Sequence, residues 1–160
     1  MGEMKEKIMV PVDFTKHTNI LVDYAVHMAQ ALAAEVKFVH VVESFSGYDM
    51  LLVHPSFDLI SADLKVKAQQ LMESLIENNK IRLKDISGDV LVGDTVDTLL
   101  DYTEKGDFDL IIVGTHGTRG FEKVLMGSVA SKLSQKTPCP ILIVNPERYL
   151  KGKKKYAGDR

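Results

Sequence analysis

The chain of 160 residues is 45% hydrophobic and 26% charged, which is typical of a globular domain and excludes disorder as its main state. A formal net charge of -2 gives no electrostatic basis for binding nucleic acid, and the single Cys139 excludes an internal disulfide and a zinc site built from several cysteines. The charged start predicts no signal peptide, and no apolar run reaches the roughly 18 residues of a membrane span. We therefore expect a cytoplasmic protein without membrane insertion.

Five short apolar runs alternate with four segments of helical periodicity. The predicted strands are 7–12, 35–42, 89–92, 109–113 and 141–144. The predicted helices extend from the connector at 14–18 to about 34, from 56 to about 79, from 95 to 106 and from 128 to about 136.

Residues at the helix ends predict how each helix begins and stops. Thr15 or Thr18 is expected to cap the first helix, and Asp94 or Thr95 the third. Gly106 is expected just past the end of the third helix, where glycine is favoured. The apolar stripe of the second and longest helix is assigned to Phe57, Ile60, Leu64, Ala68, Leu71 and Leu75.

The strand–helix alternation predicts an α/β fold, a three-layer sandwich with a five-stranded parallel sheet between two layers of helices. Right-handed crossovers and central placement of the most apolar strands favour the order 3-2-1-4-5. In such a sheet the ligand binds at the carboxyl ends of the strands where the winding direction reverses, here between strands one and four. Asp13 and Gly114 are thus expected on opposite sides of one crevice. A single domain over 1–146 is expected, followed by a basic, flexible tail at 147–160.

A glycine-rich loop begins at Gly114. Gly114, Gly117, Gly127 and Ser128 form the pattern G-x2-G-x9-G-S between a buried strand and a helix. Glycines allow an anion to approach the backbone, and a helix N-terminus offers unpaired N–H groups. The pattern is neither a Walker loop nor the dinucleotide G-x-G-x-x-G. The four residues as a set favour phosphate binding. Each residue considered alone is explained more simply, the glycines by a turn and Ser128 by a helix cap.

This loop, together with KIMVPVDF at the start and PCPILIV near the end, resembles the ATP-binding branch of the universal stress protein family. The resemblance covers residues 7–145. It implies a Rossmann-like sandwich of the adenine nucleotide alpha hydrolase-like type, an adenine nucleotide in the crevice, a homodimer, and a role in the stress response rather than a defined reaction. ATP is the expected ligand, with ADP and AMP left open. Mg²⁺ or Mn²⁺ would be held through the phosphates.

Position by position, the resemblance assigns Asp13 to the adenosine end of the nucleotide and the backbone of Val41 to the adenine. The anionic Asp13 should face a donor such as a ribose hydroxyl or the adenine amino group, and a helix-capping or turn aspartate is the alternative. Arg119 is available to neutralise phosphate charge. The complete predicted nucleotide set is Pro11, Val12, Asp13, Val41, Val113, Gly114, Thr115, His116, Gly117, Arg119, Gly127, Ser128 and Val129.

Three functions remain open from the sequence: a nucleotide-dependent regulator, an interaction module with little nucleotide dependence, and a slow ATPase. Hydrolysis needs a group that positions water, and only His116 or Glu122 is available, so no catalytic residue is assigned. The remaining histidines show no metal-ligand spacing, so no metal-ligating side chain is assigned. The short apolar strand at 141–144 lies at the sheet edge in the predicted order, which favours a homodimer through that edge. The sequence names no protein partner.

Overall fold

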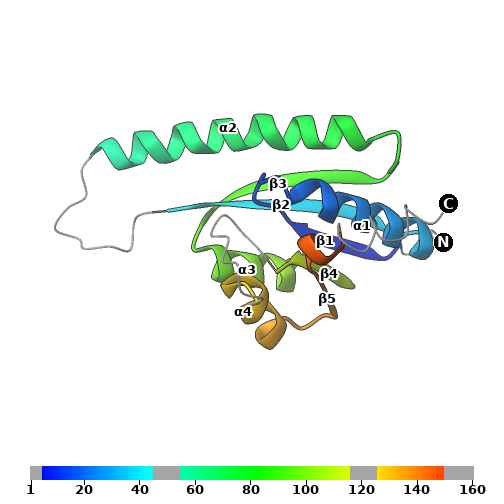
Figure 1. The fold of residues 1–160 in the computed structure, drawn as a ribbon. Coiled ribbons are helices and arrows are strands. Elements are labelled where there is room, and N and C mark those ends of the chain that lie inside the picture. Colours follow the sequence, from blue (N-terminus) through cyan, green and yellow to red (C-terminus); the bar gives the residue numbers. More distant parts are fainter. Residues whose placement is uncertain (1–4, 45–54, 116–125, 150–160) are drawn as a thin grey trace.

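The computed structural model describes residues 5–44, 55–115 and 126–149 (Figure 1). The strands are β1 (Lys7–Pro11), β2 (Glu35–Glu43), β3 (Ile86–Gly93), β4 (Leu110–Gly114) and β5 (Ile141–Val144). The helices are α1 (Thr18–Leu32), α2 (Pro55–Asn79), α3 (Thr95–Gly106) and α4 (Ser128–Lys136). Of the helices in these ranges, none is long and apolar enough to cross a membrane.

All neighbouring strands pair in parallel, in the order β3-β2-β1-β4-β5. The predicted order is therefore confirmed, and the fold is the Rossmann-like α/β sandwich that the alternation of elements indicates. Ile8 of β1 lies beside Val36 of β2 on one side and Leu110 of β4 on the other. The winding direction reverses between β1 and β4, so the carboxyl ends of these two strands adjoin at the centre of the sheet.

Each face of the sheet has its own core. Helices α1 and α2 cover one face, where Val10, Phe38 and Ile112 are fully buried, and α3 and α4 cover the other, where Met9 and Ile111 are fully buried (Figure 1). The strands are apolar on both faces because both faces are covered, which is the usual condition of a parallel sheet.

The helix starts follow the sequence prediction at α3 but not at α1. The Asp94 carboxylate caps α3, accepting hydrogen bonds from two backbone N–H groups at 3.0 Å each. The N-cap of α1 is His17, without a side-chain cap bond, so the prediction of Thr15 or Thr18 was wrong. Both threonine hydroxyls donate instead to the Asp13 carboxylate.

Gly106 is the last residue of α3 rather than the residue beyond it, so its predicted position was wrong. The left-handed conformation that ends the helix belongs to Asp107, with φ 52°. An added Cβ at Gly106 would lie 2.2 Å from the ring of Phe108. The glycine is needed because an aromatic ring packs against its backbone, and a short polar residue takes the left-handed position.

The predicted apolar stripe of α2 is only partly correct. Ala68 is buried and Leu75 packs on the core, whereas the side chains of Ile60, Leu64 and Leu71 are 48%, 44% and 42% exposed. Met72, which was not in the predicted stripe, is buried against Gly88 of β3, where an added Cβ would meet its sulfur at 2.3 Å. The buried side of the helix therefore passes through Ala68, Met72 and Leu75. The side chain of Phe57 lies outside the description.

The described chain continues past Pro146 as a short helical turn over residues 146–149. Asn145 begins this turn, its side-chain oxygen accepting from Arg148 N–H at 3.2 Å and its carbonyl from Tyr149 N–H at 3.0 Å. The Tyr149 ring lies 5.1 Å from that of Tyr24 on α1. Packed structure thus reaches Tyr149, beyond the expected boundary at 146, and residues 150–160 lie outside the description.

Candidate functional site

The crevice is formed where β1 stops and its neighbours continue. Pairing between β1 and β2 ends at Pro11 and Val39, but β2 runs on to Glu43. On the other side β4 ends at Gly114. The residues of the predicted set that the fold brings to this edge are Pro11, Val12, Asp13, Val41, Val113, Gly114, Thr115, Gly127, Ser128 and Val129.

The backbone of Val41 points into this crevice. In a strand the N–H and C=O of one residue face the same neighbour, and the direction alternates along the chain. Val39 C=O accepts from Val12 N–H at 2.9 Å, so it faces β1, whereas Val36 N–H faces β3 through a 2.9 Å bond to the Asp85 carbonyl. Val41, two residues after Val39, therefore faces β1 as well, beyond the point where β1 has ended. Its side chain is 9% exposed and belongs to the core under α3 and α4.

Gly114 presents its backbone to the crevice from the opposite side. Ile111 N–H and Thr115 N–H both bond toward β5, at 3.0 and 2.9 Å. Because the direction of the backbone groups alternates along a strand, Gly114, the residue directly before Thr115, faces β1 instead. The crevice is thus lined on two sides by main-chain groups, which can donate to and accept from the edge of a planar ring or a sugar.

Asp13 lies in the first residues after β1 and is half-buried. Its Oδ1 accepts from Thr15 N–H at 3.0 Å, from the Thr15 hydroxyl at 2.8 Å and from the Thr18 hydroxyl at 3.5 Å. The turn aspartate considered from the sequence is therefore observed. All three bonds use Oδ1, and Oδ2 accepts none from the part of the chain that the structure describes. The turn consequently orients the carboxylate while leaving its second oxygen for a donor on a ligand.

Gly127 joins the start of α4 to the end of β4. Its N–H donates to Thr115 C=O at 2.8 Å, and an added Cβ would lie 2.7 Å from the same oxygen. Gly127 is the N-cap of α4, with no side-chain cap bond. The reading of Ser128 as the cap was wrong, because Ser128 is already the first helical residue, and its side chain is exposed. The first N–H groups of α4 are therefore held near the crevice by a backbone contact that only glycine permits.

Three predicted residues, His116, Gly117 and Arg119, lie outside the described residues, as does Glu122. The phosphate contacts expected from them thus stay predictions. Within the described ranges no group of three or more His, Cys, Asp or Glu side chains is placed to hold a metal ion. A cation at this site would depend on ligands other than these side chains.

One residue at the crevice was not predicted. His40 of β2 places Nδ1 2.7 Å from Val12 C=O, and its ring centroid is 4.7 Å from that of Phe14. These contacts fall on the residues immediately before and after Asp13. The sequence signal was its position in the HVV exit of strand two, directly before Val41, but histidine in a strand is more often a simple core residue.

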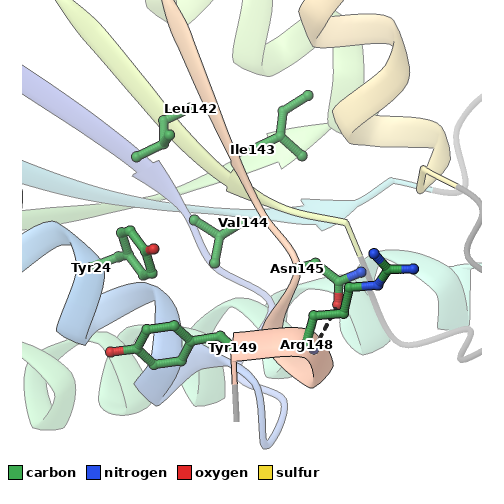
Figure 2. A pocket seen from close by; sticks show the side chains of 7 residues that line it. All are labelled: Tyr24, Leu142, Ile143, Val144, Asn145, Arg148 and Tyr149. Carbon is green, nitrogen blue, oxygen red and sulfur yellow. Dashed lines mark hydrogen bonds between the residues drawn. The ribbon is translucent and has the colours of Figure 1, made fainter. Parts of the chain in front are cut away.

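Two cavities lie elsewhere. One of about 240 Å³ sits beside β5, and Figure 2 shows Tyr24 and Tyr149 on one side of it and Arg148 directed away from both rings. Another of about 350 Å³ lies between α1 and Arg82. Neither is lined by Asp13, Val41 or Gly114, so both are separate from the crevice.

Comparison with known proteins gives the same family as the resemblance in the sequence. The family model for the universal stress protein family matches residues 4–145. The chain belongs to this family. A universal stress protein of Methanocaldococcus jannaschii, MJ0531, is 30% identical over 139 residues, covering 87% of this chain and 81% of the relative.

Solved universal stress proteins share the fold. One solved in complex with cAMP is 21% identical with a TM-score of 0.61, covering 90% of this chain and 99% of the other. One from Archaeoglobus fulgidus in complex with dAMP is 17% identical with a TM-score of 0.63, covering 89% of this chain and 100% of the other. At these identities the likeness establishes the common architecture.

Proposed function

We propose that this universal stress protein binds an adenine nucleotide, ATP in the first place, and acts as a nucleotide-dependent regulator in stress adaptation. The observation that carries the proposal is the direction of the Val41 backbone, which points into the crevice beyond the end of β1. Main-chain N–H and C=O groups at a strand edge suit the donor and acceptor edge of adenine. The cAMP and dAMP complexes of relatives with the same fold support an adenine nucleotide as the class of ligand.

In this arrangement Asp13 Oδ2 accepts from a ribose hydroxyl or the adenine amino group. The first N–H groups of α4, after Gly127, lie toward the phosphates with the positive end of the helix dipole. Gly117 and Arg119 complete the phosphate contacts. Mg²⁺ or Mn²⁺ is held by the phosphates themselves, since these hard cations prefer oxygen ligands.

Regulation is favoured over hydrolysis. A hydrolytic site needs a group that orients water and a cation that offsets the charge developing on the γ-phosphate. The sequence offers only His116 or Glu122 for the first task, and neither stands in a motif for phosphoryl transfer. We propose a cytoplasmic homodimer that pairs through β5, whose outer edge has no neighbouring strand within the described chain.

Calorimetric titration tests the proposal. ATP should bind with a dissociation constant in the micromolar range, and Asp13→Ala should weaken it. Asp94→Ala is the matched control, because Asp94 forms the same kind of turn at α3, after β3, which β2 separates from β1. Gly117→Val should abolish binding by blocking backbone approach. No heat at millimolar ATP would refute nucleotide binding and leave the interaction module, whereas repeated turnovers of phosphate release would establish an ATPase.

A further inference from the structure

His40 carries a proton on Nδ1. The group 2.7 Å from it is the Val12 carbonyl, which can only accept, so the ring nitrogen must donate. The imidazole is also fixed sideways by the Phe14 ring, at 4.7 Å and a 43° tilt. Its orientation is thereby defined by two contacts of different kinds.

The Val12 carbonyl is the acceptor that a longer ladder would use. In regular parallel pairing, Val12 N–H donating to Val39 C=O is followed by Val41 N–H donating to Val12 C=O. The first bond is present at 2.9 Å. In place of the second, Val12 C=O receives the His40 ring N–H. A side chain of β2 thus ends the ladder one step before Val41.

The chain leaves β1 at the same point. Phe14 has φ 56°, a left-handed conformation that is unfavourable for a residue with a Cβ. Its ring contact with His40 helps to hold that turn, and Asp13 lies between Val12 and Phe14. One imidazole therefore contacts both neighbours of Asp13 and donates to the carbonyl that Val41 N–H would use in a longer ladder.

We infer that His40 is a positioning residue that ends the β1–β2 ladder and so reserves the Val41 N–H for the adenine ring. This inference rests on the proposed nucleotide site and assigns the residue that keeps it open. His40 itself touches no nucleotide in this arrangement.

Two substitutions separate the donor from the shape of the side chain. Asparagine can place an N–H donor where Nδ1 lies, so His40→Asn retains the bond to Val12, whereas His40→Leu fills similar space without a donor. His27→Leu on α1 is a control for losing an exposed histidine away from the crevice. In His40→Leu the Val12 carbonyl becomes available to Val41 N–H.

The decisive measurement is amide hydrogen exchange without nucleotide. Exchange at Val41 should slow in His40→Leu relative to Val36, which is bonded to Asp85 C=O in the same strand, and should stay at the wild-type ratio in His40→Asn and His27→Leu. A merely structural role would speed exchange at both residues. An unchanged or raised Val41 ratio in His40→Leu overturns the inference.

ATP titration completes the test. His40→Leu should weaken ATP at least about fivefold, the order expected for one lost hydrogen bond, with His40→Asn within about twofold of wild type. Equal affinity in His40→Leu and wild type overturns the inference. If the wild type binds no ATP, the proposed function fails by itself, and the Val41 exchange ratio alone decides whether His40 ends the ladder.

Discussion

The junction between β4 and α4 gives the sharpest prediction, through Gly127→Ala. The backbone angles at Gly127, φ -55° and ψ 153°, are accessible to alanine, so no dihedral strain is expected. The added Cβ would instead lie 2.7 Å from Thr115 C=O, a backbone atom that cannot rotate aside. The effect of the substitution therefore reports the closeness of two backbone segments and nothing else.

The magnitude follows from that contact. The junction must open by several tenths of an ångström, which lengthens the 2.8 Å hydrogen bond from Gly127 N–H to Thr115 C=O. Loss of this bond costs about 1 kcal/mol, and overpacking against a backbone atom typically costs about 1–3 kcal/mol. For a chain of this size, a total of about 2–4 kcal/mol corresponds to a fall in Tm of roughly 5–12 °C.

Thermal unfolding and ATP calorimetry check both consequences. Gly127→Ala should lower Tm and weaken ATP, since the N-terminus of α4 shifts from the crevice. Ser128→Ala is the control, because Ser128 makes no side-chain cap bond, and its Tm should change by about 1–2 °C at most. A Gly127→Ala variant with wild-type Tm would refute the close junction. A lowered Tm with unchanged ATP affinity would place the phosphates away from α4.

Three further outcomes are expected. Asp94→Ala should lower the unfolding free energy by about 1 kcal/mol, because two cap hydrogen bonds of 3.0 Å are lost, and unchanged urea denaturation would contradict this. Burial and the hydrogen bond to Asp89 raise the pKa of the Tyr102 phenol above its usual value near 10, so the folded state holds this proton more tightly than the unfolded one. Stability from this group is present below about pH 10 and lost as the pH rises further, and the loss seen by urea denaturation should be absent in Tyr102→Phe. Ile143→Pro removes an N–H that points to the free edge of β5, so sedimentation should show monomer, whereas Leu142→Pro removes one that faces β4 and should unfold the protein.

The sheet and its order were predictable because they depend on patterns that span the whole chain. The alternation of apolar runs with helical periodicity fixes the layers, and handedness leaves few orders. The Asp94 cap was predictable for a local reason: the carboxylate of an aspartate directly before a helix finds its N–H donors within two or three residues. Neither depends on which side chains meet across the fold.

The incorrect predictions concern side-chain contacts that helix periodicity and capping preferences do not show. Thr15 and Thr18 had a competing acceptor, Asp13, which their sequence positions do not rank against a helix terminus. Gly106 is needed for the ring of Phe108 and not for a turn. On α2, apolar residues lie on more than one side of the helix, so periodicity did not show that Met72 and not Leu71 is buried.

The candidate site was also predictable only in part. The place of the crevice follows from the strand order, but the direction of the Val41 backbone depends on register, which apolar patterning in a strand covered on both faces does not fix. His40 was missed because its role depends on a carbonyl 28 positions earlier in the chain. The contacts predicted for His116, Gly117 and Arg119 remain predictions.

A crevice lined by main chain has a consequence for how such a protein can change over time. Replacement of the side chain at Val41 leaves its N–H and C=O in place, provided the new residue fits the core under α3 and α4. Recognition is thereby separated from most side-chain identities, and restriction falls on the few positions where shape decides, such as Gly127. Sequences on this scaffold can diverge widely and retain one binding geometry, so the level of identity between two such chains is a poor guide to whether they share a ligand.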